Sequence, residues 1–148
     1  MRNLWHLIKR FFISITAAAL SSEEQAEVSA VLLPAENALF VRLPKPDQRH
    51  ALQVLRRFDR LVPSAPVVAR RAALLHDIGK LDSGLGTTKR VVATVAGSRS
   101  RKFRAYHDHE QIGADLLIAA GSDPRTVKLV RGEGDIRHVD ALRRADAI

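Results

Sequence analysis

The stretch ALLHDIGKL, residues 73–81, decides how this sequence is interpreted, because two adjacent polar residues interrupt an apolar segment. Helical spacing places Val68, Ala72 and His76 on one stripe, so His76 and its neighbour Asp77 start from a half-buried position. Burying polar groups without partners costs about 2–7 kcal/mol. We therefore expect both side chains to have a partner that offsets this cost.

Composition limits the classes of protein to consider. The chain has 148 residues, enough for one domain with a substantial core, and its 46% hydrophobic and 27% charged content is ordinary for a globular protein. It has no cysteine, which excludes disulfides, thiolate metal sites and a cysteine nucleophile. The 24 Lys and Arg residues outnumber the 16 Asp and Glu residues, giving a net charge of +8. This excess favours anionic partners, such as nucleotides, nucleic acid or a membrane surface, without choosing among them.

Residues 1–20 form a basic and apolar N-terminal segment that ends in an apolar run from Phe11 to Leu20. This run is too short to span a bilayer, which takes about 20 residues. We expect a helix packed on or appended to the domain, because Leu4, Ile8 and similar residues recur at helical spacing. Contact with a membrane surface and a cleaved signal peptide remain alternatives. We favour a cytoplasmic location.

Beyond this segment, almost every periodic stretch predicts a helix. Ser21 and Glu24 form a capping-box pattern that opens the first of these helices, and Pro34 ends it. Asp123 followed by Pro124 marks another helix start. The expected helices cover approximately residues 21–33, 47–61, 67–79, 109–120, 124–131 and 136–148.

The region between the third and fourth expected helices is harder to interpret. Residues 82–88 are a glycine-containing loop, residues 89–97 fit either a short helix or a strand, and residues 98–108 are expected to be a basic loop. The sequence has no internal repeat, no long linker and no convincing pair of strands. It therefore predicts a single all-α domain, residues 21–148, with six or seven helices.

Four polar residues lie on or beside the apolar stripes of three predicted helices: His50, His76, Asp77 and Asp146. Taken singly, each could be a hydrogen-bonded core residue or a helix cap. Together, two imidazoles and two carboxylates could converge on one divalent metal. A metal would also explain why buried polar groups are tolerated.

The order of these motifs resembles the HD-domain superfamily, specifically its HDIG-type members. The resemblance runs from about residue 47 to residue 148 and rests on HDIGK at 76–80, HEQIGADLL at 109–117 and the aspartate in LRRADAI at 142–148. It implies an all-helical fold of metal-dependent phosphohydrolases, which act on phosphomonoesters and phosphodiesters, often of nucleotides.

The same resemblance implies roles for individual residues. His50, His76, Asp77 and Asp146 match the family's metal ligands, with Asp77 also handling the proton of the attacking water. Lys80 matches a lysine near the substrate phosphate. His109 matches a histidine that ligates a second ion in two-metal members and faces the phosphate in others. The metal would be divalent (Mn, Fe, Co, Ni, Zn or Mg). Apart from the resemblance, four basic residues further along either form an ordinary solvated loop or help to neutralise the phosphate: Arg99, Arg101, Lys102 and Arg104.

The sequence also departs from the family's pattern. Two-metal members carry a further histidine downstream of the HxxxGA histidine, where this chain has Arg131 and Gly132. His138 could substitute only if its loop folds back. The GYP motif of cyclic-di-GMP phosphodiesterases is absent, which disfavours that activity.

Two other classes of function stay open beside a phosphohydrolase. The chain could be a non-catalytic metal- or nucleotide-binding module with a regulatory role, or a basic nucleic-acid-binding helical protein whose histidines are structural. The second leaves HDIGK unexplained and lacks an aromatic-rich or helix-turn-helix signature. A metal-dependent oxidase of the same fold is a further alternative.

Overall fold

The computed structural model describes residues 18–83 and 101–147. Within these ranges every regular element is a helix: α2 (Ser22–Val31), α3 (Pro34–Phe40), α4 (Lys45–Leu61), α5 (Val67–Leu75), the 3-10 helix η1 (Ile78–Ser83), α7 (Arg101–Ala119), α8 (Pro124–Val130) and α9 (Ile136–Asp146). The prediction of an all-α domain is therefore confirmed. No helix in this part of the chain is long and apolar enough to cross a membrane.

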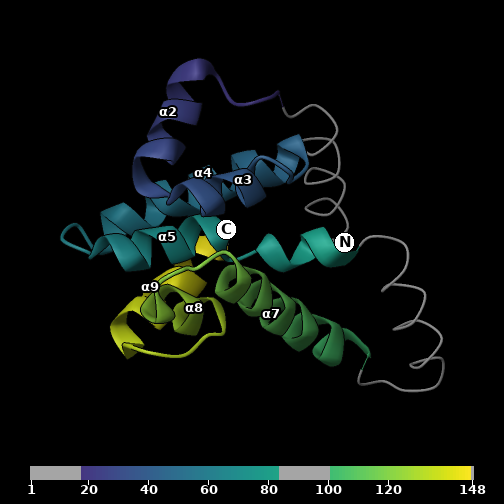
Figure 1. The fold of residues 1–148 in the computed structure, drawn as a ribbon. Coiled ribbons are helices and arrows are strands. Elements are labelled where there is room, and N and C mark those ends of the chain that lie inside the picture. The colour runs from purple at the N-terminus through teal and green to yellow at the C-terminus, as the bar shows by residue number, and fades with distance from the viewer. Residues whose placement is uncertain (1–17, 84–100, 148) are drawn as a thin grey trace, which may run out of the picture.

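Helix α5 is the centre of the arrangement. Most of its residues are buried, which is typical of a helix covered on all sides: Val68, Ala69, Ala72, Ala73, Leu74 and Leu75. It packs mainly against α4 and α8, and also contacts α2 and α3. Figure 1 shows α2 and α3 on one side of the α4–α5 pair, with α7, α8 and α9 on the other side.

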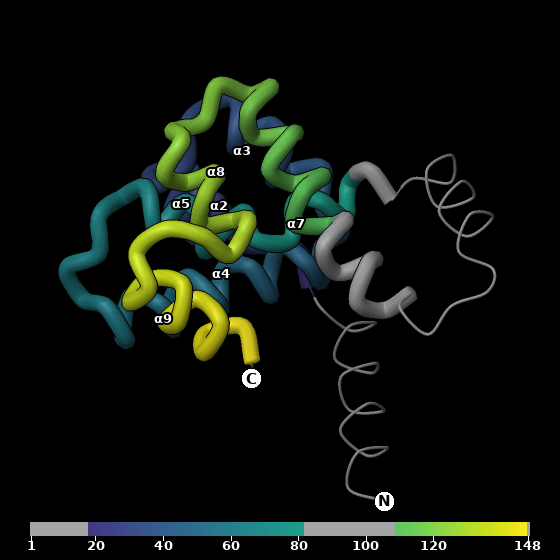
Figure 2. Tube along the Cα trace, turned by 90° about the horizontal axis from the view of Figure 1, so that it is seen from below, coloured from purple at the N-terminus to yellow at the C-terminus, as the bar shows by residue number. Residues whose placement is uncertain are grey.

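Helices α4 and α9 bring two distant parts of the chain together. Residues on the apolar stripe of α4 are buried: Ala51, Leu52, Val54, Leu55 and Phe58. Helix α9 lies beside α4 (Figure 2). Its residues Val139, Leu142 and Ala145 are buried. The Arg57 guanidinium donates a hydrogen bond of 3.0 Å to the Ala145 carbonyl, which ties the last turn of α9 to α4. The end of α9 is therefore held in place, although it lies close to the end of the chain.

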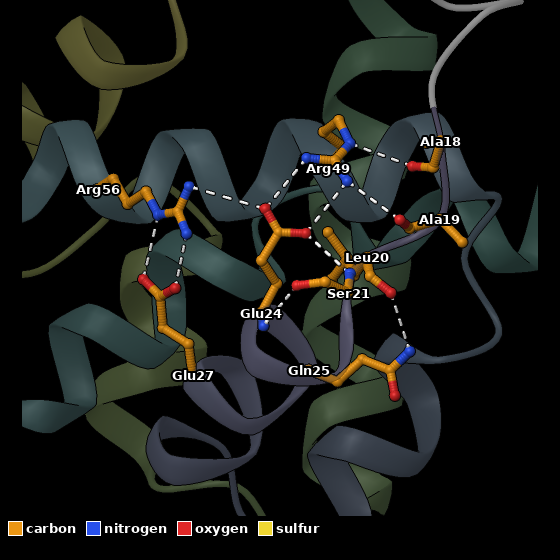
Figure 3. Close-up of polar contacts among 9 residues, drawn as sticks. All are labelled: Ala18, Ala19, Leu20, Ser21, Glu24, Gln25, Glu27, Arg49 and Arg56. Atoms are coloured by element: carbon orange, nitrogen blue, oxygen red, sulfur yellow. Dashed lines mark hydrogen bonds and ion pairs between the residues drawn. The ribbon is translucent and has the colours of Figure 1, made fainter.

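Arg49 fastens the segment before α2 to helix α4 (Figure 3). Its guanidinium donates to the carbonyl oxygens of Ala18 and Ala19 at 3.1 Å each, and to the carboxylate of Glu24 at 3.1 and 3.2 Å. Glu24 also accepts a hydrogen bond from the Ser21 backbone N–H, which completes the predicted capping box of α2. Because Arg49 directly precedes His50, this network fixes the turn of α4 that carries the first candidate ligand.

Several predicted helix boundaries agree with the structure. Asp123 caps α8 by accepting a hydrogen bond of 2.9 Å from the Arg125 backbone N–H. Gly121 follows α7 with a φ of +78°, a conformation in which glycine has no steric penalty. Residues 1–17, with most of the predicted N-terminal helix, and residues 84–100, with the segment left open between helix and strand, lie outside the described ranges.

Other predictions about local structure were wrong. Helix α2 ends at Val31, and Pro34 is the first residue of α3, a helix that was not predicted. The first residue of a helix donates no helical hydrogen bond, so a proline there loses none. Helix α5 ends at Leu75 rather than at Gly79. Residues 101–108, expected in a basic loop, belong to α7. Ile136 has the helical spacing of the buried Val139 and Leu142, but it is 71% exposed because it lies in the first turn of its helix.

Candidate metal centre

Three helix ends supply the predicted ligands. His50 lies in the second turn of α4, His76 is the C-terminal cap of α5, and Asp77 follows it directly. Asp146 is the last residue of α9. The packing of α4 against both α5 and α9 therefore brings together residues that are up to 96 positions apart.

The four side chains converge on a small volume. His50 Nε2 lies 2.9 Å from Asp146 Oδ1, and His76 Nε2 lies 3.3 Å from the same oxygen and 3.5 Å from Asp77 Oδ2. The rings of His50 and His76 meet edge to face, with centroids 5.6 Å apart. One donor atom from each of His50, His76 and Asp77 lies within 4.8 Å of the other two, a spacing at which one ion could contact all three.

His76 shows most clearly that a cation fits here. Its Nδ1 lies 2.8 Å from the Ala73 carbonyl oxygen, so Nδ1 carries the hydrogen and donates it. A neutral ring then presents the lone pair of Nε2, which is buried and makes no hydrogen bond to any described residue. Backbone fixation of one ring nitrogen is the usual way in which proteins orient a metal-ligating histidine.

The histidines and carboxylates of this cluster shift one another's pKa values. The hydrogen bond with His50 and the closeness of the His76 ring hold the pKa of Asp146 well below its usual range. Burial alone would lower the pKa of His76, but the Asp146 and Asp77 carboxylates outweigh it and raise that pKa. Electron-rich atoms this close require a proton or a cation between them. The nitrogen and oxygen donors suit a divalent transition metal, so the residues present fit the ion that the sequence predicts.

A cavity of about 900 Å³ opens from this cluster. Lys80 and His109, the other two predicted site residues, line it together with the four candidate ligands. The Lys80 ammonium donates to Asp77 Oδ2 at 2.8 Å and lies 3.9 Å from Asp47 Oδ1. The helix expected over residues 67–79 would have placed Lys80 one α-helical turn beyond His76. Lys80 lies instead on η1, and the 3-10 geometry still places it beside Asp77.

The two motif glycines explain how His109 comes to the same cavity. Gly79 of η1 lies so close to α7 that an added Cβ would overlap the His109 carbonyl oxygen. An added Cβ at Gly113 would lie 3.1 Å from the Gly79 nitrogen. The glycines of HDIGK and HExxGA therefore face each other, and the absence of both side chains allows η1 and α7 to pack closely.

The structure adds four charged residues that the motifs did not identify as part of the site. Glu110, Arg131 and Arg143 line the cavity, and Asp47 approaches Lys80. Of these four, Arg143 could have been identified from the sequence, because it lies three residues before Asp146 on the same expected helix. Of the predicted basic residues, Arg99 lies outside the described ranges, and the other three belong to the first turns of α7.

His138 does not contribute to the cluster. Its ring meets the Phe58 ring edge to face, with centroids 6.3 Å apart, and it is not part of the cavity lining. The loop between α8 and α9 therefore does not fold back to deliver this histidine. Arg131 and Gly132 occupy that part of the cavity wall instead.

Comparison with protein-family models gives a match to the HD domain over residues 47–140, which is more than half of the chain. The chain belongs to the HD-domain family. HD domains are commonly metal-dependent phosphohydrolases, and the matched range contains five of the candidate site residues: His50, His76, Asp77, Lys80 and His109. The match ends before Asp146, so the case for that residue rests on its contacts with the two histidines. No curated protein and no solved structure matches the chain.

Proposed function

We propose that this HD domain hydrolyses a phosphate ester, a phosphomonoester or phosphodiester of nucleotide size, with the help of one divalent metal ion. The observation that carries the proposal is the buried Nε2 of His76, which has no hydrogen-bond partner among the described residues and lies between two carboxylates at the end of a large cavity. Membership of the family adds the chemistry that such a site commonly performs.

His50, His76, Asp77 and Asp146 would hold the ion. Bound there, a divalent metal would lower the pKa of water and polarise a phosphoryl oxygen, which are the two contributions that ester hydrolysis needs from a Lewis acid. Asp77 is the residue best placed to take or orient the proton of the attacking water, because its carboxylate would lie beside the ion and is held there by a hydrogen bond of 2.8 Å from the Lys80 ammonium.

Lys80 and His109 would act on the phosphate. The Lys80 side chain is 40% exposed, and its ammonium can turn from Asp77 toward a phosphoryl oxygen without leaving the cavity. His109 lines the cavity from α7 and can donate a proton or a hydrogen bond to the ester oxygen that leaves as the phosphorus–oxygen bond breaks. These residues supply charge where it develops in the transition state.

The size of the cavity supports a substrate larger than a simple phosphate. At about 900 Å³, it lies near the upper end of the roughly 300–1,000 Å³ that small-molecule sites occupy. Apolar residues form part of its wall, so a base or a similar flat group could pack there: Leu129, Val130, Val139 and Leu142. A nucleotide is the partner that combines these requirements with the net charge of +8.

The test begins with metal content. Wild-type protein purified without chelator should carry about one divalent metal per chain, and His76→Ala should lose it. His138→Ala is the matched control, because it removes a histidine that packs on Phe58 outside the cavity. A wild type that contains no metal after supplementation with each of the candidate ions would refute the site.

Hydrolysis is then measured with p-nitrophenyl phosphate, its bis-ester and a panel of nucleotides. We expect turnover that requires metal, is lost in His76→Ala and is unchanged in His138→Ala. Full metal occupancy without turnover of any of these esters would favour the alternative, a regulatory module that binds metal or nucleotide. Binding of DNA or RNA that is indifferent to His76→Ala and to chelator would favour a nucleic-acid-binding protein.

A further inference from the structure

Arg131 is an unusual feature of the cavity wall. It caps the C-terminus of α8 with ordinary helical backbone angles, and its side chain is only partly exposed. The guanidinium Nε is buried and has no hydrogen-bond partner within the described ranges. Because arginine stays charged at any physiological pH, a buried donor of this kind is unfavourable unless an anion completes it.

Arg143 places a second guanidinium on the same wall. It lies three residues before Asp146 on α9, about 5 Å along the helix axis, and it lines the cavity. Its Nη2 is 3.8 Å from the position that a Cβ on Gly132 would occupy, so the residue after Arg131 leaves this space open. Neither arginine forms an ion pair within the part of the chain that the structure describes.

The charges around the cavity indicate what the arginines would bind. The wall holds three basic side chains, Lys80, Arg131 and Arg143, and three acidic side chains, Asp77, Glu110 and Asp146. These charges balance, so a divalent metal at the histidine–aspartate cluster would leave two positive charges in excess. The Lys80 ammonium is already 2.8 Å from Asp77 Oδ2 and 3.9 Å from Asp47 Oδ1, and Asp47 is not part of the cavity wall. The excess therefore lies with the two arginines.

We propose that Arg131 and Arg143 bind the phosphoryl group that is hydrolysed, and that the substrate is a phosphomonoester. This inference rests on the proposed function and narrows it. A monoester phosphate carries two negative charges at neutral pH and matches the excess of two, whereas a diester carries one. A guanidinium can also bind two phosphoryl oxygens at once, which an ammonium cannot do with the same geometry.

The test measures the binding of inorganic phosphate to metal-loaded protein by calorimetry, at about pH 8, where phosphate is mainly a dianion. Arg131→Gln and Arg143→Gln should each weaken binding by roughly 10- to 100-fold, because each loses a charge-assisted hydrogen bond. Arg131→Lys should lie between Arg131→Gln and wild type. Arg144→Gln is the matched control: it removes the same charge from the next position of α9, where the side chain is exposed and does not line the cavity.

Dimethyl phosphate serves as the monoanionic comparison, and wild-type protein should bind it more weakly than inorganic phosphate. Metal content and thermal unfolding are recorded for every variant. If Arg131→Gln does not fold, the exposed Arg143→Gln and the conservative Arg131→Lys still decide the result.

Each outcome bears on the inference. Phosphate affinity that is equal in Arg131→Gln, Arg143→Gln and Arg144→Gln would overturn it, as would no phosphate binding by wild type or equal affinity for dimethyl phosphate. Hydrolysis of esters by wild type alongside such a result would show that the proposed function stands without this inference. Arginine-dependent phosphate binding in a protein that hydrolyses no ester would show that the two arginines form a phosphate site but that the proposed hydrolysis is wrong.

Discussion

Replacing Gly79 with alanine tests how the two glycine-containing motifs of this chain, HDIGK and HExxGA, pack against each other. The new Cβ would overlap the carbonyl oxygen of His109 and lie 3.0 Å from the nitrogen of Gly113. Both neighbours are backbone atoms in the middle of α7, so no flexible side chain can move aside. We expect η1 to separate from α7, and Asp77 and Lys80 to shift with it.

The expected change in the free energy of unfolding of Gly79→Ala follows from two opposing effects. Overpacking a core typically costs about 1–3 kcal/mol, and a contact with backbone belongs at the upper end of that range. Alanine also restricts the unfolded chain, which returns about 0.4–1 kcal/mol because Gly79 does not have a positive φ. The free energy of unfolding should therefore fall by about 2–3 kcal/mol, and the melting temperature by roughly 5–10 °C.

Urea unfolding of Gly79→Ala, Gly113→Ala and Gly121→Ala measures this directly. Gly121 has nothing within 4 Å of an added Cβ, but its φ of +78° makes alanine unfavourable by about 1–2 kcal/mol. Gly113→Ala should be the mildest, because the helical preference of alanine, about 1 kcal/mol, offsets contacts of 3.1 and 3.2 Å. A loss of stability in Gly79→Ala no larger than in Gly121→Ala would refute the reasoning.

Two further predictions concern Lys80 and Glu36. Lys80→Ala should keep its metal and lower ester hydrolysis by roughly 10- to 1,000-fold, since one charge-stabilising donor is lost; unchanged steady-state rates would show that the lysine only supports Asp77. Glu36 is fully buried on α3, and its burial raises the pKa of its carboxyl group, an effect that the nearby Arg71 charge only partly opposes. The stability that a protonated Glu36 contributes is present below its unfolded pKa of 4.5 and is lost as pH rises through its folded pKa. Urea unfolding from about pH 5 to about pH 8 should therefore show wild type losing stability relative to Glu36→Gln; parallel curves would contradict this.

Local signals in the sequence were sufficient for most of the helices. Capping residues act within one turn of the chain, so Ser21 with Glu24 and Asp123 with Pro124 could be identified without any tertiary information. Apolar periodicity likewise located α4 and most of α9, because both helices bury one face.

Features that depend on contacts between distant segments could not be predicted in the same way. Helix α5 ends at Leu75, and the turn that follows directs His76 and Asp77 toward α4 and α9. The apolar pattern of the sequence gives no sign of this helix end. The close approach of Gly79 to His109 involves residues 30 positions apart. In the sequence, Arg131 only stood where a histidine was expected. The structure shows that its side chain lines the cavity and that its Nε is buried.

The position of Asp146 links the proposed chemistry to the packing of the domain. Its carboxylate contacts both histidines, and it is the last residue of α9. What holds it is the buried contact of α9 with α4 and the hydrogen bond from Arg57 to Ala145. Helix α4 supplies both that anchor and His50, two turns apart on the same element. Metal affinity should therefore depend on α4–α9 packing as much as on the ligands themselves, because binding free energy at a site assembled from distant segments is also folding free energy.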